Sequence, residues 1–368
     1  MIFYGKQSVN KEDIDAVTEV LRSDFLTQGH KVAEFEKGLS DYCDVDYVKT
    51  VCNATAALHL AYLSIGLQKG DVVWTVPNTF VATASAALYC GAEVDFVDID
   101  PKTYNMSIKC LEEKLSSSKK EGKLPKLVVP VHFAGQSCEM EDIWKLSQKY
   151  GFKVIEDASH ALGGKYKGSK IGCCKYSNMT VFSFHPVKMI TTGEGGAIAT
   201  NDAQLDKKVA LLRSHGITKS RTELIGNMDG DWYYEQQQLG FNYRLTDIQS
   251  ALGISQLKRL DDFVKKRQMI AERYLNDLKS VELPYQHPDS ESSWHLFVIK
   301  TNRRDKTYHT LRSQGIMTQV HYIPVNKQPL FNREGLPNSD NYYKKCLSLP
   351  IYYDLDDDMQ SRVISGIL

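Results

Sequence analysis

The stretch Thr180-Val-Phe-Ser-Phe-His-Pro-Val-Lys188-Met-Ile-Thr-Thr-Gly-Glu-Gly-Gly-Ala-Ile-Ala-Thr200 decides the fold. One apolar run leads into Lys188 and a second, Ala197–Thr200, follows the glycines, which predicts two strands joined by a loop. Glycines let a backbone approach a phosphate closely, so this arrangement suits an amine on an exposed turn beside bound phosphate. The alternative is an ordinary solvated surface lysine, as most lysines are.

Short β-branched runs alternate with helical patterns on the N-terminal side of this stretch. Because many of these runs are apolar on both faces, they predict a mostly parallel sheet covered by helices on each side, an α/β fold. The charged stretch from Lys114 to Lys126 is predicted to be a solvated loop. The predicted strands are Val72–Val76, Glu93–Val97, Leu127–Val131, Lys153–Ile155 and Thr180–Phe182.

The C-terminal third has a different organisation. A long helical pattern from Thr246 to Leu278 is predicted to bridge two lobes. Two predicted strands, Trp294–Ile299 and Ile316–Tyr322, flank a helix around Lys306–Ser313. We therefore expect a large domain over residues 1–245, and a bridging helix with a small α+β domain over residues 246–368.

Composition narrows the class of partner. The chain has 45 Lys and Arg against 45 Asp and Glu, which gives no electrostatic footprint for nucleic acid or an anionic membrane. No apolar run is long enough to span a bilayer. The eight cysteines are scattered without zinc spacing, so no metal site is predicted and reduced thiols are expected. A cytoplasmic protein with a small-molecule partner fits.

Asp157 is the first candidate partner of Lys188. It lies where a buried strand is predicted to end, and ligands of open α/β sheets bind at such carboxyl ends. A carboxylate there can hold a protonated ring nitrogen, which pyridoxal phosphate needs to act as an electron sink. The alternative is that Asp157 only caps the next helix.

Two further elements suit the same cofactor. Small polar residues around Ala54 and Thr55 open a helix whose free amides attract phosphate, and Ser183 offers a second phosphate contact. Phe80 follows another strand and can stack on a flat heterocycle. The alternative for Phe80 is a residue that packs the first helical turn.

Together these motifs form a pattern that a single cofactor can use. With Leu26–Gly29 and Leu239–Gly253, they resemble the DegT/DnrJ/StrS sugar-nucleotide aminotransferases over nearly the whole chain. The resemblance implies the type I fold of aminotransferases that depend on pyridoxal 5′-phosphate, with a mostly parallel central sheet and a smaller α+β C-terminal domain.

The resemblance also implies roles for individual residues. Lys188 would bind the cofactor's aldehyde, Asp157 would pair with the pyridine nitrogen, and Phe80 would stack on the ring. A homodimer with shared active sites is implied, because one phosphate ligand would come from the neighbouring subunit. The implied phosphate ligands are Ala54, Thr55, Ser183 and, from that neighbour, Asn242.

Within the family, the chain looks most like the enzymes of pseudaminic acid synthesis that aminate the 4-keto carbon of a UDP-linked 6-deoxy-N-acetylhexosamine. His160, where many members carry glutamine, would lie near the cofactor's phenolic oxygen; a core histidine satisfied by backbone groups is the alternative. Arg244 or Arg213 would bind the carboxylates of L-glutamate, the amino donor. The residues matching positions that face the nucleotide sugar are Tyr4, Gln28, His185, His321 and Tyr322.

The expected reaction has two half-reactions, in which Lys188 serves both covalent attachment and proton transfer. Lys188 argues against one alternative, a related sugar dehydratase, which would carry histidine in its place. Another nucleotide 4-keto or 3-keto sugar could be the substrate. A non-catalytic regulator that binds effectors is a third possibility. A nicotinamide dehydrogenase would need the G-x-G-x-x-G motif, which does not follow the first strand.

Overall fold

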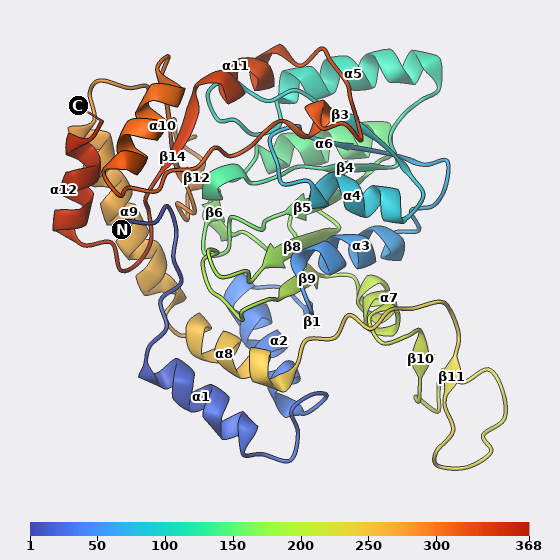
Figure 1. The fold of residues 1–368 in the computed structure, drawn as a ribbon. Coiled ribbons are helices and arrows are strands. Elements are labelled where there is room, and N and C mark those ends of the chain that lie inside the picture. Colours follow the sequence, from blue (N-terminus) through green and yellow to red (C-terminus); the bar gives the residue numbers. More distant parts are fainter. Residues whose placement is uncertain (368) are drawn as a thin grey trace.

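The computed structural model describes residues 1–367. Its centre is a seven-stranded sheet in the order β1-β9-β8-β5-β4-β2-β3, with helices on both faces (Figure 1). The strands from β8 to β3 are parallel, whereas β9 runs antiparallel to both of its neighbours. The predicted α/β fold with a mostly parallel sheet is confirmed.

The five predicted strands of the sheet all form, each within two residues of the expected bounds. In chain order, the strands are β1 (Tyr47–Val51), β2 (Val72–Thr75), β3 (Glu93–Phe96), β4 (Leu127–Val129), β5 (Lys153–Asp157), β6 (Lys165–Tyr166), β7 (Ser169–Lys170), β8 (Met179–Ser183), β9 (Gly196–Thr200), β10 (Ile217–Thr218), β11 (Glu235–Gln236), β12 (Ser290–Glu291), β13 (Phe297–Lys300) and β14 (Cys346–Leu349).

Helices connect and cover these strands. They are α1 (Lys11–Leu21), α2 (His30–Cys43), α3 (Ala54–Ser64), α4 (Ala82–Tyr89), α5 (Ile108–Glu121), α6 (Met140–Tyr150), α7 (Ala203–Leu212), α8 (Asp247–Leu257), α9 (Leu260–Asp277), α10 (Arg304–Ser313), α11 (Pro337–Lys345) and α12 (Asp357–Ser365), with short 3₁₀ turns at Phe133–Gly135 and Val325–Lys327.

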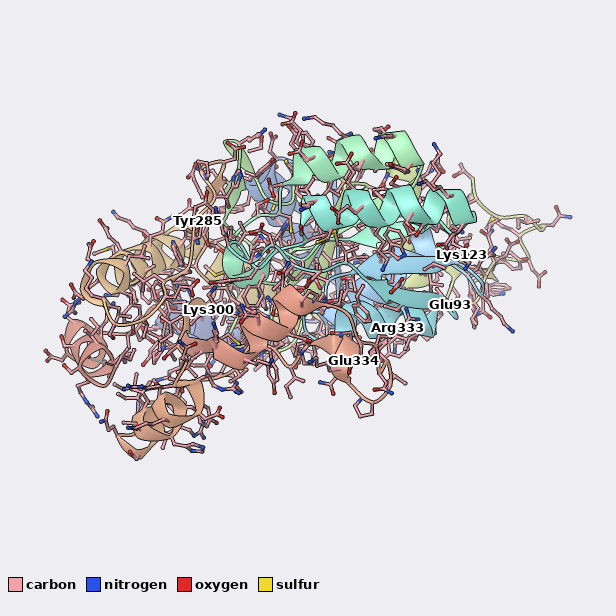
Figure 2. The ribbon with its side chains drawn as sticks, turned by 90° about the horizontal axis from the view of Figure 1, so that it is seen from above. Glu93, Lys123, Tyr285, Lys300, Arg333 and Glu334 are labelled. Carbon is pink, nitrogen blue, oxygen red and sulfur yellow. The ribbon has the colours of Figure 1, made fainter. Side chains whose placement is uncertain are left out.

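Alternation along the strands divides the core into two faces. Val73 packs with α3, α4 and α7 on one face, whereas Trp74 packs with α5 and α6 on the other. The helices α5 and α6 lie side by side (Figure 2). In the same way Val181 of β8 faces α3, and Phe182 faces α2 and α9. Because both faces are covered, the functional groups are left to the strand ends.

The C-terminal part has its own hydrophobic core. β13 and β14 pair antiparallel, and apolar residues of α9, α10 and α12 pack around them. The predicted helix at Lys306–Ser313 is confirmed as α10. The predicted boundary between residues 245 and 246 stays a prediction; α8, just after it, packs against α1 and α2.

The predicted loop at Lys114–Lys126 is wrong over most of its length, because α5 continues to Glu121. Ser107 caps the start of this helix, and Gly122 ends it in a left-handed conformation with φ 68°. Only Leu111 and Leu115 are buried in α5. So narrow an apolar stripe is hard to recognise within a run of lysines and serines.

The predicted continuous helix from Thr246 to Leu278 is interrupted. α8 ends at Leu257 and α9 begins at Leu260. At the break, the guanidinium of Arg259 donates to the buried carboxylate of Asp13 at 2.5 Å. Because this contact joins residues 246 positions apart, the periodicity of the sequence does not predict the break between the helices.

The second predicted strand of the small lobe is also largely wrong. Ile316–Tyr322 forms only isolated bridges, one from Ile316 to Ile2 and one from Gln319 to Ser348. His321 instead uses its ring to bond Ser348, with Nδ1 2.8 Å from Oγ. Isolated bridges and a side-chain hydrogen bond therefore take the place of the predicted continuous β-strand in this segment.

Candidate active site

Lys188 lies in the loop between β8 and β9, as predicted, but it is partly buried rather than fully exposed. Burial lowers the pKa of its amine to about 8, while the nearby carboxylate of Asp157 favours the charged form. No hydrogen bond to residues 1–367 contributes to this shift. A part of the amine is therefore neutral near physiological pH, which an ordinary lysine with a pKa of 10.5 is not.

Asp157 is buried at the carboxyl end of β5. Its Oδ2 accepts a hydrogen bond from Thr83 Oγ1 at 2.7 Å, and its Oδ1 accepts from the backbone N–H of Ser159 at 3.1 Å. No helix begins after Asp157, so the helix-cap alternative is wrong. Two hydrogen bonds thus fix the carboxylate close to the amine of Lys188.

The start of α3 has free backbone N–H groups. Asn53 caps the helix by accepting the N–H of Ala56 at 2.8 Å, whereas the N–H groups of Ala54 and Thr55 find no acceptor within residues 1–367. Gly196 of β9 lies directly against this turn, because a Cβ on it would stand 2.8 Å from the Ala54 nitrogen. Ser183 pairs with Gly196 across the two strands. The predicted phosphate ligands Ala54, Thr55 and Ser183 are therefore neighbours.

His160 and Tyr322 are 162 positions apart in the sequence but lie in contact. His160 is buried, and its Nε2 lies 3.0 Å from the hydroxyl of Tyr322. The backbone N–H of Ala134 donates to His160 Nδ1 at 3.4 Å, which places the ring proton on Nε2. Burial, followed by the charge of Lys188, holds the pKa of His160 well below its usual value. His160 is thus a neutral donor close to Lys188.

Two more predicted residues surround this pair. The ring of Phe80 is 59% exposed and lies 6.4 Å from that of Tyr322, so it does not pack the first turn of α4. His321 is buried against Tyr4, with ring centroids 5.2 Å apart. Burial and the charge of Lys188 lower the pKa of His321 to about 3.

Among the remaining predicted residues, His185 lies beside Lys188 in the same loop. Its side chain is exposed, its carbonyl accepts the backbone N–H of Lys188 at 2.9 Å, and the pKa of its imidazole is lowered first by partial burial and further by the charge of Lys188. Gln28 is exposed, Asn242 is exposed beside a bridge to Ser214, and Arg244 pairs through its backbone with Val51, just before the start of α3. No contact among the described residues brings these last three side chains to Lys188.

Arg213 is excluded as a ligand for glutamate. Its Nη1 donates to Glu36 Oε1 at 2.5 Å and to the carbonyl of Thr50 at 2.7 Å. Both groups are largely buried, so this guanidinium is committed to holding α7, α2 and β1 together.

The sequence reasoning missed two residues of the site. Thr83 holds Asp157 and is itself bonded to Thr79, with the hydroxyls 2.8 Å apart. The ring of His295 contacts that of His160, with centroids 4.4 Å apart and the planes tilted by 44°, and its buried Nδ1 has no partner in the described residues. Thr83 follows Phe80 by one helical turn, but nothing in the sequence pairs it with Asp157.

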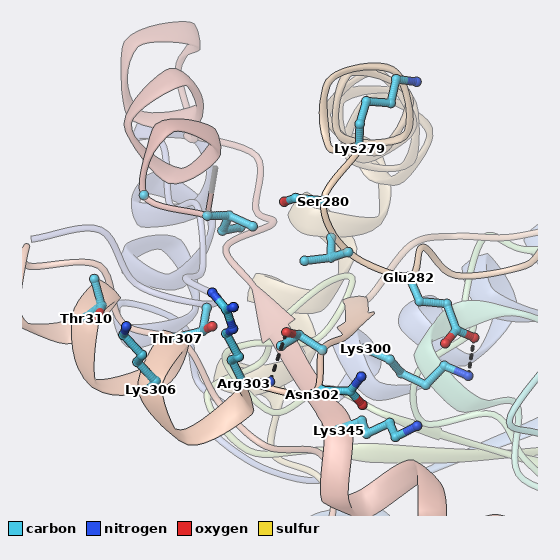
Figure 3. Close-up of a pocket in the computed structure, with 14 residues that line it drawn as sticks. Lys279, Ser280, Glu282, Lys300, Asn302, Arg303, Lys306, Thr307, Thr310 and Lys345 are labelled. Carbon is cyan, nitrogen blue, oxygen red and sulfur yellow. Dashed lines mark hydrogen bonds and ion pairs between the residues drawn. The ribbon is translucent and has the colours of Figure 1, made fainter.

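A cavity of about 770 Å³ lies away from this site. It sits on the small lobe between the end of α9, β13, α10 and the C-terminal turn (Figure 3). None of the predicted site residues lines it. Basic side chains dominate its wall, among them Lys300, which pairs with Glu282. The reactive groups are therefore located by their contacts and not by cavity size.

Among residues 1–367, none of the helices has both the length and the apolar character needed to cross a membrane.

Comparison with known proteins identifies the family. The sequence profile of the DegT/DnrJ/EryC1/StrS aminotransferase family matches residues 7–368. The UDP-4-amino-4,6-dideoxy-N-acetyl-beta-L-altrosamine transaminase of Campylobacter jejuni is 40% identical over 370 residues, which are 97% of this chain and 94% of the relative. Spore coat polysaccharide biosynthesis protein SpsC of Bacillus subtilis is 37% identical over 99% of this chain and 95% of its own length.

A solved structure agrees with these relatives. Helicobacter pylori PseC, an aminotransferase involved in the biosynthesis of pseudoaminic acid, superposes with a TM-score of 0.90 at 33% identity, covering 100% of this chain and 98% of that chain. The resemblance inferred from the motifs is confirmed, and the chain belongs to the DegT/DnrJ/EryC1/StrS aminotransferase family.

Proposed function

We propose that the protein transfers an amino group from L-glutamate to the 4-keto carbon of a UDP-linked 6-deoxy-N-acetylhexosamine, in the pseudaminic acid pathway. The observation that carries this proposal is the amine of Lys188, whose pKa burial lowers to about 8 and which lies beside the fixed carboxylate of Asp157. The names and the similarity of the relatives from Campylobacter jejuni and Helicobacter pylori support this sugar.

The cofactor is pyridoxal 5′-phosphate, on which this aminotransferase family depends. When bound, it supplies an electron sink for negative charge at the reacting carbon. The site fits it, because the free N–H groups of Ala54 and Thr55 and the hydroxyl of Ser183 suit its phosphate. Asp157 would hold the ring nitrogen, and the exposed ring of Phe80 would stack on the heterocycle.

Lys188 carries out the proton transfer in this proposal. An amine with a pKa of about 8 is partly neutral near pH 7.5, so its Nζ can accept a proton from the substrate carbon and return it. The carboxylate of Asp157 would pair with the ring nitrogen of the cofactor and favour its protonated form. The hydroxyl oxygen of Tyr322 accepts from His160 Nε2 at 3.0 Å, so its own proton is available to the substrate or cofactor.

We assign the nucleotide-sugar contacts to the residues around this centre. Tyr4, His321 and Tyr322 lie together, as their ring contacts support. Gln28 and His185 are exposed and available to a large substrate. Arg244, close to the start of α3, is our candidate for a glutamate carboxylate, since Arg213 is committed elsewhere.

A homodimer with shared active sites completes this proposal. Asn242 is exposed and would reach the phosphate of the neighbouring subunit. The adjoining segment from β10 to Gly240 exposes large apolar side chains, including Ile225 at 85%, Trp232 at 75% and Leu239 at 80%. This segment projects from the rest of the fold (Figure 1). Exposed apolar groups gathered on one segment favour a protein contact. Eight free cysteines support a cytoplasmic location.

One alternative has specific support. The alternative is another nucleotide keto-sugar, because SpsC, which is similar over 99% of the chain, is named for spore coat polysaccharide biosynthesis and not for this sugar. Residue types do not separate these sugars, because UDP, GDP and dTDP substrates share their phosphates.

Mass spectrometry of products tests the proposal. The holoenzyme is given L-glutamate and a panel of UDP-, GDP- and dTDP-linked 4-keto sugars, with a 3-keto sugar included. We expect amination of the UDP-linked 4-keto 6-deoxy-N-acetylhexosamine and release of 2-oxoglutarate. Amination of another sugar alone would support the alternative, whereas no amine product from any sugar would reject both.

A further inference from the structure

Glu156 is a second buried carboxylate, next to Asp157 in β5, and the proposed function gives it no role. It is 6% exposed, and its side chain points to the face opposite that of Asp157 because neighbours in a strand alternate. A buried carboxylate is costly unless it is hydrogen-bonded, so its partners show what it does.

Three side chains satisfy Glu156. Its Oε2 lies 2.6 Å from Nε2 of the fully buried His132, while its Oε1 accepts from Ser177 at 2.5 Å and from Thr180 at 2.9 Å. The other nitrogen of His132 accepts the N–H of Cys138 at 3.1 Å, so Nε2 donates to Glu156. Burial opposes the charge of Glu156, but these bonds outweigh it and lower the pKa.

The backbone on the two sides of Asp157 is held by the same neighbours. The N–H of His132 donates to the carbonyl of Asp157 at 3.0 Å, and the N–H of Asp157 donates to Pro130 at 2.9 Å. On the other side, Asp157 pairs with Val181 and Glu156 pairs with Thr180 of β8. Glu156 therefore joins, through its side chain, the two segments that hold Asp157 through their backbones.

We propose that His132 and Glu156 are positioning residues for Asp157. By tying the residues after β4 to β8, they fix the end of β5 and thereby the direction of the Asp157 carboxylate, while Thr83 fixes its far oxygen. A directional hydrogen bond restrains this strand end in a way that apolar packing does not. This inference rests on the proposed function, in which Asp157 holds the ring nitrogen of the cofactor.

Four variants separate positioning from simple stability. His132→Leu removes one of the three donors of the buried Glu156 carboxylate and is expected to lower the melting temperature. The double change His132→Leu with Glu156→Leu removes the buried charge but leaves the hydroxyls of Ser177 and Thr180 without this acceptor, so the melting temperature should recover in part. His132→Gln can donate to Glu156 and accept from Cys138, so it is the conservative rescue. Asp157→Asn is the reference for a lost ring-nitrogen contact.

The decisive readout is NMR of bound pyridoxal 5′-phosphate labelled at the ring nitrogen. We expect the protonated-ring signal in the wild type and in His132→Gln, and a shift toward the Asp157→Asn signal in the double variant. Its kcat should fall about tenfold with the KM for the sugar within about twofold. A double variant with the wild-type signal and kcat would overturn the proposal. The signal needs only bound cofactor, so a wrong sugar assignment would leave this result standing.

Discussion

The hydroxyl of Tyr322 lies 3.0 Å from Nε2 of His160, which joins the segment before the second 3₁₀ turn to the turn that follows β5. Since Nδ1 of His160 accepts the backbone N–H of Ala134, the ring proton is on Nε2 and His160 donates to Tyr322. The proton of Tyr322 is then free for a group outside the chain. Burial raises the pKa of Tyr322, so that proton is retained at neutral pH.

Tyr322→Phe removes this hydroxyl and should lower kcat. A lost hydrogen bond to a reacting group typically costs about 10- to 100-fold in rate. The aromatic ring is kept, and we expect the free energy of unfolding to change by only about 1 kcal/mol. Steady-state kinetics and urea unfolding measure the two effects. Unchanged kcat would show that Tyr322 fills space only.

His160 gives the matching pair of variants. His160→Gln keeps a donor near Tyr322 and should retain most of the activity, whereas His160→Ala leaves Tyr322 unpaired and should lose activity at least as strongly as Tyr322→Phe. Equal activity of the two His160 variants would contradict the hydrogen-bonding role.

Lys188→Met should stabilise the protein without cofactor at pH 7 while abolishing transamination. Folding lowers the pKa of Lys188 from 10.5 to about 8, so the unfolded chain binds more protons between these pH values. Stability of the wild type therefore rises as pH increases through this window. Methionine has no charge to desolvate on folding. We therefore expect the free energy of unfolding to rise by about 1 to 2 kcal/mol, part of it offset by the lost attraction to Asp157.

Urea unfolding at pH 7 and pH 10 checks the sign. The advantage of Lys188→Met should shrink at the higher pH, because most of the wild-type amine is then neutral in the folded state. An advantage that grows with pH would show that Lys188 is not desolvated.

The lysine loop and its carboxylate were predictable because they follow strands with a strong β signal. Asp157 and Lys188 lie at the ends of β5 and β8, and adjacent parallel strands bring such ends together. The start of α3 was predictable for the same kind of reason, since Asn53 and the small residues after it are a local helix-start signal. Predicting these features requires only the local sequence and the rule that the carboxyl ends of adjacent parallel strands lie at the same edge of a sheet.

Contacts between distant segments were not predictable in this way. Thr83 and Asp157 are 74 positions apart, and His160 and Tyr322 are 162 apart. Arg213 carries no local sign that it is bound to Glu36. The sequence pattern does not predict α5 beyond Lys114, because only two residues of this helix, Leu111 and Leu115, are buried. Tertiary partners and not periodicity decide such positions.

Arg213 and Arg244 should respond in opposite ways to replacement. Arg213→Met leaves the carboxylate of Glu36 largely buried without its partner, so we expect a loss of about 3 kcal/mol in stability and little change in the KM for glutamate. Arg244→Met should leave stability within about 0.5 kcal/mol and raise that KM about tenfold or more. Urea unfolding and initial rates at varied glutamate separate the two. A higher KM for Arg213→Met alone would reverse the assignment.

Gly196→Ala should weaken phosphate binding at the start of α3. The added Cβ would stand 2.8 Å from the nitrogen of Ala54 and from the carbonyl group of Asn53, so either β9 or the helix start must move. β9 is held by ladders to β1 and β8, which leaves the first turn of α3 as the part that yields. The free amides would then turn away from the phosphate, and we expect cofactor affinity to fall about tenfold.

Gly193→Ala is the control for backbone strain. Gly193 has φ of 80°, which disfavours alanine, but a Cβ there meets no atom within 4 Å. Its cost of about 1 kcal/mol should appear in unfolding alone. Absorbance titration with pyridoxal 5′-phosphate compares the two variants. If both lose affinity equally, strain in the glycine-rich loop is responsible; if only Gly196→Ala does, the contact between β9 and α3 shapes the phosphate site.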